Sequence, residues 1–169
     1  MAVDNPFTRI ARRYGWLPGP LRRPLISWAV GRTIRFVGTA GVRIAALTPT
    51  RVAARLPDRP RVHNHVGGMH AAAMALLAET VTGLVVAMNV PGESVPVLRT
   101  LEVAYRRRAE GALTAEATLS DEEAKRIRRA PIGKIDVSVT VVDAAGRRPI
   151  ECTLQWAWLP KDRVFRSAA

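Results

Sequence analysis

The sequence predicts an α+β domain in which an antiparallel sheet of about five or six strands is wrapped around one central apolar helix. Residues 69–88 carry apolar side chains nearly all the way round at helical spacing, so this helix must be buried on most of its faces. Four later segments alternate strictly between apolar and polar residues, which is typical of strands with one buried face. A sheet that curls around the helix satisfies both observations.

The elements are expected in a simple order along the chain. They are helices at 6–15 and 21–37, strands at 42–47 and 51–56, a loop at 57–68, the central helix at 69–88, and strands at 100–105, 113–119, 135–141 and 150–158. Ser120 and Glu123 have capping-box spacing and predict a short exposed helix between the strands at 113–119 and 135–141. We therefore expect an N-terminal helical extension at 1–40, the sheet domain at 41–160 and a C-terminal tail at 161–169.

Positive charge is concentrated at the N-terminus. The 169 residues have a formal net charge of +12, and the first 60 residues, with eleven arginines and two acids, contribute +9 of it. Such a segment could contact nucleic acid or an anionic membrane surface. Aromatic residues make up only 5% of the chain and few lie among the arginines, where stacking on bases would need them. Nucleic acid is therefore not an expected partner, and weak membrane-surface contact stays open.

The composition also limits the cellular setting. The single cysteine, Cys152, excludes a disulfide scaffold and favours a reducing, cytoplasmic location. No segment has the length and apolar character of a membrane-spanning helix, and the first residues lack the apolar core of a secretory signal.

Glu79 is the one formally charged residue between Val62 and Gly92. It lies in the middle of the predicted central helix, and its neighbours three and four residues away are uncharged, so no salt bridge along the helix is available. A carboxylate in such surroundings must be paired from another element, be protonated or face a cavity. We single out Glu79 as a candidate catalytic residue. The alternative is a structural ion pair with an arginine of a neighbouring strand.

The loop before the central helix is the second candidate region, and it holds all three histidines of the chain. Gly67 and Gly68 would allow a ligand to approach the backbone closely, and the free N–H groups at a helix start can hold an oxyanion or a phosphate. Asn64 can donate or accept a hydrogen bond, and His70 can shuttle a proton. The alternative is a glycine turn in which Asn64 or His70 caps the helix. A metal site is not expected, because no acidic ligand lies near the histidines in sequence.

The spacing of His70 and Glu79 constrains how the two could act together. Nine residues along one helix separate them by about 13–14 Å and place them on opposite faces. They cannot serve one reacting atom within a single chain. If both act, two chains must pack around a two-fold axis, each lending its glutamate to the loop of the other.

The run from Asn64 to Ala72, followed by Glu79, resembles the motif of hot-dog-fold thioesterases, in particular the PaaI-like branch and more closely the DUF4442 group. The pattern of that family is an asparagine, a histidine six residues later and an acid nine residues after the histidine. Asn64, His70 and Glu79 fit both spacings. The resemblance covers roughly residues 40–160. It implies a hot-dog fold and a homodimer, and leaves open whether two dimers pair into a tetramer.

The resemblance also implies roles for these residues in hydrolysis of an acyl-CoA or acyl-carrier thioester. Glu79 would act as general base or nucleophile, and Asn64 of the facing subunit would position water or substrate. His70 would orient the backbone N–H of Ala71, which would polarise the thioester carbonyl. No separate cofactor is implied, since coenzyme A enters as part of the substrate.

The same resemblance places coenzyme A along the subunit interface, next to the loop at Gly67 and Gly68. Arginines would bind its phosphates, and the candidates are Arg106, Arg107 and Arg108. The chain departs from many PaaI-like enzymes in having Ala71 after the histidine in place of glycine, and glutamate in place of aspartate. An alternative function is therefore a non-catalytic acyl-CoA-binding or lipid-binding module, associated with membranes through its basic N-terminus.

Overall fold

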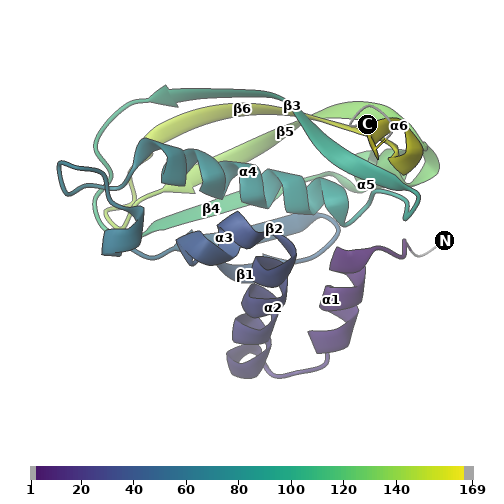
Figure 1. The fold of residues 1–169 in the computed structure, drawn as a ribbon, viewed down its shortest axis with the longest axis horizontal. Coiled ribbons are helices and arrows are strands. Elements are labelled where there is room, and N and C mark those ends of the chain that lie inside the picture. The colour runs from purple at the N-terminus through teal and green to yellow at the C-terminus, as the bar shows by residue number, and fades with distance from the viewer. Residues whose placement is uncertain (1–2, 166–169) are drawn as a thin grey trace.

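The computed structural model describes residues 3–165 and contains a six-stranded antiparallel sheet with the strand order β1-β2-β4-β5-β6-β3 (Figure 1). The strands are β1 (Arg43–Leu47), β2 (Arg51–Leu56), β3 (Ser94–Tyr105), β4 (Leu113–Thr118), β5 (Gly133–Val142) and β6 (Ile150–Pro160). The helices are α1 (Pro6–Tyr14), α2 (Gly19–Thr33), α3 (Arg35–Ala40), α4 (Ala71–Ala87), α5 (Asp121–Arg129) and α6 (Lys161–Phe165), with a 3₁₀ turn η1 (Pro60–Val62). The α+β prediction is confirmed.

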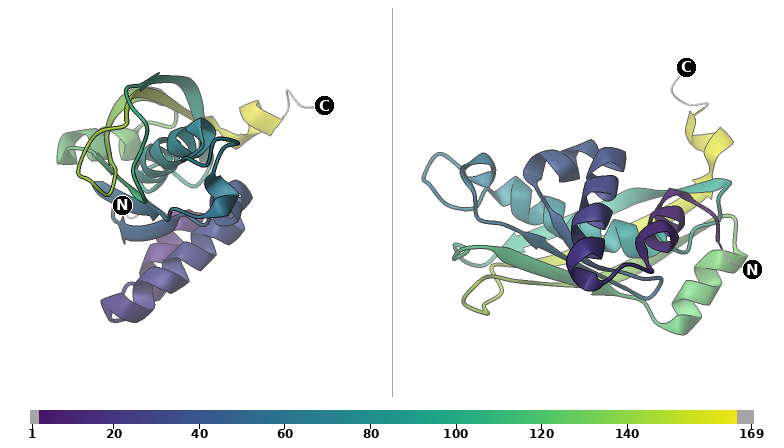
Figure 2. Two further views of the ribbon diagram at one scale, coloured as in Figure 1. Left: turned by 90° about the vertical axis from the view of Figure 1, so that its left-hand side faces the viewer. Right: turned by 90° about the horizontal axis from the view of Figure 1, so that it is seen from below.

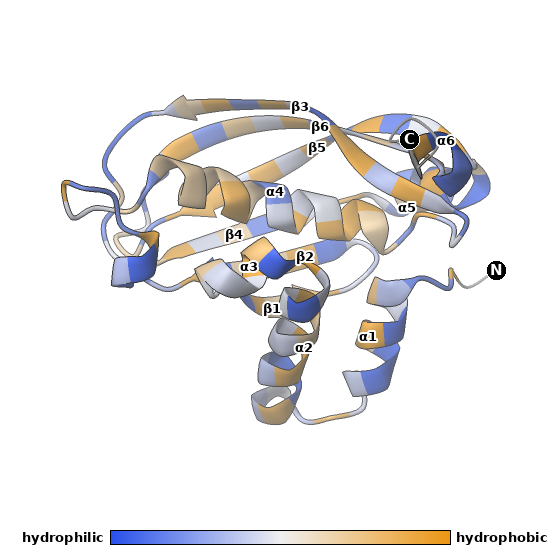
Figure 3. Cartoon of the chain, viewed as in Figure 1, coloured by the Kyte–Doolittle hydropathy of each residue, from blue (hydrophilic) through white to orange (hydrophobic). Residues whose placement is uncertain are grey.

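The sheet curls around α4, as the view along the helix in Figure 2 shows. Twelve of the 17 residues of α4 are buried, because β2 to β6 all pack against it. The hydropathy colouring in Figure 3 shows that α4 is apolar over most of its length. The prediction of an enclosed apolar helix is confirmed. The helix begins two residues later than predicted because Met69 pairs with His63 in an isolated β-bridge and His70 is the N-cap.

β4, β5 and β6 largely follow the predicted alternation, whereas β2 buries Val52, Ala53 and Ala54 in succession and β3 has no regular pattern. In β4, for example, Leu113, Ala115 and Ala117 are buried and the intervening residues are not. β3 begins at Ser94, six residues before the predicted start, because its first half lacks alternation. It is the edge strand next to β6, and its register shifts between Leu98 and Thr100. An edge strand with a bulge has no uniform buried face. The first half of β3 therefore lacks the alternation of buried and exposed residues from which strands are predicted.

The N-terminal helices pack beside the sheet and project away from it (Figure 1). The predicted helix at 21–37 is divided into α2 and α3 by Ile34, which has an extended conformation (φ −114°, ψ 90°). α2 covers the free edge of β1, where the backbone N–H of Ile44 donates to the hydroxyl of Ser27 at 2.9 Å. No helix within residues 3–165 is long and apolar enough to cross a membrane.

Asn5 attaches α1 to the end of the central helix. Its side-chain oxygen accepts hydrogen bonds from the backbone N–H groups of Phe7 and Thr8, which caps α1. Its amide donates to the carbonyl oxygens of Ala87 at 2.6 Å and Val90 at 3.0 Å. Only 7% of Asn5 is exposed. One side chain thus fixes the position of α1 relative to α4.

Candidate active site

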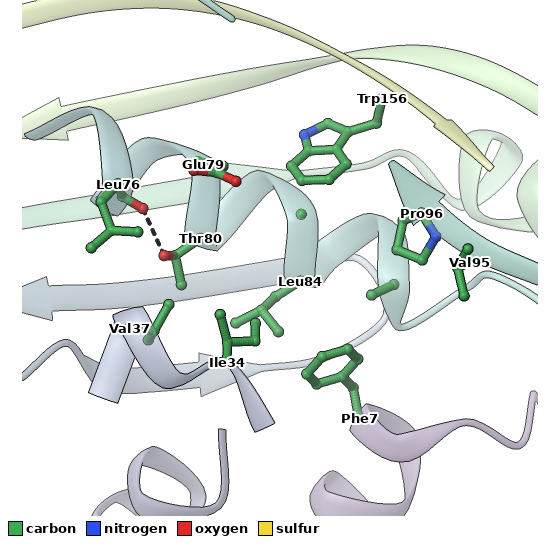
Figure 4. A pocket seen from close by; sticks show the side chains of 12 residues that line it. Phe7, Ile34, Val37, Leu76, Glu79, Thr80, Leu84, Val95, Pro96 and Trp156 are labelled. Atoms are coloured by element: carbon green, nitrogen blue, oxygen red, sulfur yellow. Dashed lines mark hydrogen bonds between the residues drawn. The ribbon is translucent and has the colours of Figure 1, made fainter. Parts of the chain in front are cut away.

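Glu79 lies in the middle of α4, half-buried, in the wall of a pocket of about 310 Å³ (Figure 4). The pocket is almost entirely apolar. Besides Glu79 it is lined by Phe7, Ile34, Val37, Leu76, Thr80, Gly83, Leu84, Ala87, Val95, Pro96 and Trp156. The carboxyl group therefore faces a space that is suited to an apolar ligand group.

The carboxyl group of Glu79 has no hydrogen-bond or ion-pair partner within the described part of the chain, so the alternative of a structural ion pair with a strand arginine is not observed there. Burial raises its pKa, because the charged form loses water that no protein group replaces. Two other lining residues have polar side-chain atoms, and these already form hydrogen bonds elsewhere. The hydroxyl of Thr80 donates to the carbonyl of Leu76 at 2.6 Å, and the indole N–H of Trp156 donates to the hydroxyl of Thr82 at 3.1 Å.

Residues far apart in the sequence build the walls of this pocket. Figure 4 shows Phe7 and Ile34 on the side of the N-terminal helices and Trp156 and Pro96 on the side of β6 and β3. None of these was identified from the sequence. The sequence offers one indication of a space beside the helix, which is Gly83, a residue without a side chain one turn after Glu79 in a mostly apolar helix. A Cβ atom there would lie 2.7 Å from Cη2 of Trp156.

The loop before α4 is organised by Asn64. Its side-chain oxygen accepts hydrogen bonds from the backbone N–H groups of Val66 and Gly68, both at 3.1 Å. Its own N–H donates to the carbonyl of Gly68 at 2.8 Å. Gly67 has φ +74°, a left-handed conformation that favours glycine. Asn64 therefore has a clear structural task, which was one of the two interpretations of this residue.

His70 caps α4, as the structural alternative proposed. Its Nδ1 accepts a hydrogen bond from the N–H of Ala72 at 3.0 Å. Ala71, an exposed residue, is the first of the helix. Its N–H has no hydrogen-bond partner in residues 3–165 and belongs to the unsatisfied N–H groups of a helix start. The carbonyl of Ala71 accepts from the hydroxyl of Tyr105 at 3.0 Å, which links this end of α4 to β3.

The three candidate arginines differ in their surroundings. Arg106 forms an exposed ion pair with Glu151 at 2.8 Å, so its charge is already matched. Arg107 is exposed and is anchored through its backbone N–H to Pro149. Arg108 lies against the glycine loop, because a Cβ atom on Gly68 would be 3.0 Å from its Nε. Arg108 is thus the one of the three that shares an open pocket with the loop.

Within one chain the predicted site residues form two groups. Asn64, Gly67, Gly68, His70, Ala71 and Arg108 lie at the N-terminal end of α4, whereas Glu79 lies mid-helix in the apolar pocket. His63 lies at the same end of α4 through its bridge to Met69, with its Nε2 atom 2.5 Å from Asp58, and His65 is exposed in the loop. Within residues 3–165 no three His, Cys, Asp or Glu side chains are grouped as a metal site would require. Ser94, the first residue of β3, is buried, and its hydroxyl donates to the carbonyl oxygen of Pro131 at 2.8 Å.

The fold and this motif define a class of protein. The family model for the domain of unknown function DUF4442 matches residues 22–159, and this chain belongs to that family. Its fold is the hot-dog fold, with the central helix wrapped by the sheet.

Solved structures show the same fold. A Pseudomonas aeruginosa protein of unknown function, named a probable thioesterase, is 25% identical with a TM-score of 0.71, and the match covers 85% of this chain and 97% of that one. The Haemophilus influenzae thioesterase HI1161 is 17% identical with a TM-score of 0.61, covering 79% of this chain and 90% of that one. A thioesterase family protein from Silicibacter pomeroyi is 16% identical with a TM-score of 0.63, and the match covers 79% of this chain and 96% of that one. No curated protein matches the chain.

Proposed function

We propose that this protein is a thioesterase that hydrolyses an acyl-CoA or acyl-carrier thioester, with Glu79 as the catalytic carboxylate. The observation that carries the proposal is the unpaired carboxyl group of Glu79, with its raised pKa, in the wall of an apolar pocket. A carboxyl group whose pKa is raised toward neutrality is a more effective general base than one that ionises at its usual value. The thioesterase names carried by similar folds support the same reaction class.

The reaction can be written with the residues of two chains. The acyl group would enter the apolar pocket, which favours a small or medium hydrocarbon chain over a charged acyl group. Glu79 would take a proton from water as the water oxygen attacks the thioester carbonyl carbon. In the alternative route the Glu79 carboxylate attacks that carbon itself to form an acyl anhydride with loss of the thiolate, and water then hydrolyses the anhydride, releasing the acid, the free carboxylate and the proton. The N–H of Ala71 from the facing subunit would stabilise the oxyanion. The C–S bond then breaks, and the thiolate leaving group takes up the proton.

A homodimer supplies the geometry that one chain lacks. β3 is 12 residues long and leaves one edge unpaired, whereas the edge of β1 is covered by α2. An open edge of this length is suited to pairing with another copy of the same strand. Arg108 and the glycine loop would then bind the phosphates of coenzyme A. No separate cofactor is needed, and a cytoplasmic location remains a prediction from the cysteine content.

The test is hydrolysis of a chain-length panel of acyl-CoAs by the wild type and by Glu79→Gln. Loss of the catalytic base should lower kcat by about 10²- to 10⁴-fold without unfolding the protein. Glu122→Gln on α5 is the matched control, since it removes an exposed carboxylate far along the chain from the pocket. Equal hydrolysis by wild type and Glu79→Gln would falsify the assignment.

One observation favours a second function, a non-catalytic acyl-CoA-binding module. Asn64 and His70 both use side-chain acceptors to organise the backbone of the loop and the helix start. A binding module would retain a bound acyl-CoA, show no turnover in the wild type, and bind equally well after Glu79→Gln. Mass spectrometry of the co-purified ligand distinguishes intact thioester from free acid.

A further inference from the structure

α2 is apolar on two faces, and only one of them is covered. Ile26 and Val30 are buried, facing the sheet. Leu21, Leu25 and Trp28 follow one another at spacings of four and three residues, so they form a second stripe on the helix. They are 60%, 38% and 58% exposed. A surface helix ordinarily has one apolar stripe, which faces the core. The second stripe of α2 is exposed and is not covered by any other part of residues 3–165.

The exposed apolar surface extends beyond α2. Trp16 is 79% exposed and lies in the loop between α1 and α2, at the end of the helix pair farthest from the sheet (Figure 1). Phe36, near the start of α3, is 63% exposed. Five of the eight large hydrophobic residues that are exposed in the described chain therefore lie between positions 16 and 36. We call Trp16, Leu21, Leu25, Trp28 and Phe36 the N-terminal apolar surface.

The segment that carries this surface is strongly basic. Residues 3–40 contain seven arginines and a single acid, Asp4. Asp4 lies 3.9 Å from Arg9 and 3.7 Å from Arg12, so the other five arginines have no ion pair among the described residues. The guanidinium of Arg32 lies 5.4 Å from the ring centroid of Trp28, so a cation and an exposed indole share one face. The segment thus combines exposed apolar side chains with arginines that have no ion pair, and one of these arginines lies against Trp28.

We propose that α1, α2 and their connecting loop dock on an anionic phospholipid surface. Trp and Leu side chains would enter the boundary between headgroups and acyl chains, while the arginines contact lipid phosphates. Charge decides the occupant. Two copies of this strongly basic segment placed face to face would repel each other, whereas an anionic bilayer matches both the apolar residues and the charge.

This docking is independent of the proposed hydrolysis. Its tryptophans do not line the pocket, yet Phe7 on α1 and Ile34, directly after the last residue of α2, do. A docked molecule would therefore hold the pocket near the lipid surface.

The experiment is co-sedimentation of the full chain with vesicles of phosphatidylcholine, with and without phosphatidylglycerol. We expect binding only to the mixed vesicles, weakened by salt. Tryptophan emission gives a second readout. Trp156 and Trp158 are buried, so a blue shift on binding would come from Trp16 and Trp28. Equal binding to both vesicle types, or to neither, would overturn the proposal.

Paired variants separate the surface from general effects. Trp16→Ser with Trp28→Ser should abolish binding, and Ile132→Ser, which alters an exposed apolar residue elsewhere, should not. Arg32→Gln with Arg35→Gln, which removes the cation against Trp28 and the one next to Phe36 in sequence, should weaken binding roughly tenfold or more. The control pair, Arg126→Gln with Arg129→Gln on α5, should bind like the wild type.

Two outcomes would contradict the proposal at this stage. One is equal loss of vesicle binding in the test and control pairs. The other is a combination of two results: the wild type does not bind vesicles, and the Trp16/Trp28 variant forms a smaller oligomer than the wild type in size-exclusion chromatography. That combination would assign the N-terminal apolar surface to contact between copies of the chain. Hydrolysis of a soluble acyl-CoA without vesicles should be unchanged by the tryptophan variants, so failure of docking and failure of the thioesterase assignment are told apart.

Discussion

Glu79 carries a carboxyl group whose pKa is raised because its half-buried position removes water from the charged form. The ordinary glutamate value is 4.5, so on raising the pH the unfolded chain ionises before the folded one. The contribution of Glu79 to stability is present below that value and is lost as the pH rises through the folded pKa. We expect the Tm of Glu79→Gln to exceed that of the wild type at neutral pH and to converge with it in acid. Thermal melts of both proteins across pH measure this, and a pH-independent difference would contradict it.

Gly83 is a second residue with a measurable consequence. The Cβ atom of an alanine would lie 2.7 Å from Cη2 of Trp156, a ring held by its hydrogen bond to Thr82. We expect Gly83→Ala to lower the free energy of unfolding by about 1–3 kcal/mol, because overpacking outweighs the better helix propensity of alanine. Urea unfolding measures the change. Gly19→Ala is the control, since its Cβ would meet nothing within 4 Å, and it should leave stability almost unaltered.

For single residues, the sequence identifies those that differ in chemistry from their neighbours along the chain and misses those that do not. Glu79 is detectable because the surrounding stretch carries no other formal charge. The capping role of His70 was one of two alternatives, and only the local geometry decides that its Nδ1 accepts from Ala72. Phe7 and Ile34 could not be assigned to the pocket, because nothing local indicates which distant helix they approach.

The N-terminal helix α1 depends on one side chain for its position. Asn5 caps α1 and also donates to two carbonyl oxygens at the end of α4. Asn5→Ala should therefore cost about 1–3 kcal/mol of stability and raise KM, because Phe7 moves away from the pocket. Asn5→Asp keeps the cap but loses the amide donors, so it should affect KM as well.

The matched control for this cap is Ser120→Ala. Ser120 caps α5 through the predicted capping box, with its hydroxyl accepting from Glu123 N–H at 3.2 Å. This variant should lose about 1 kcal/mol while KM stays unchanged. Acyl-CoA kinetics combined with thermal unfolding separate the two effects, and an equal rise in KM for both caps would argue against a specific role of α1.

Elements with a regular buried face were the most predictable. The central helix and strands β4, β5 and β6 follow from periodicity because each has one uniform environment along its length. The early part of β3 and the break at Ile34 do not, because a bulged edge strand and a helix corner depend on contacts from other elements.

For the whole molecule, the proposed site requires two chains, and this can be tested by mixing variants. Ala71→Pro removes the unpartnered N–H, and proline is tolerated at the first position of a helix. Ala71→Pro and Glu79→Gln should each be almost inactive. Random re-association of the two should restore about a quarter of wild-type activity, because half of the dimers then contain one intact composite site.

Absence of recovery in the mixture, with heterodimers demonstrated by mass, would mean that each site is built within one chain. Self-mixed samples of each variant serve as controls for the re-association step itself.

The strand order has a consequence for synthesis on the ribosome. Among the strands, β3 hydrogen-bonds only to β6. About 45 residues separate the end of β3 at Tyr105 from the start of β6 at Ile150, so β6 is synthesised well after β3. Until β6 emerges, β3 has two open edges, so the nascent protein passes through a stage in which a 12-residue strand is available to other chains. The last strand to be translated thus closes the fold, and any stop before it leaves a product prone to aggregate.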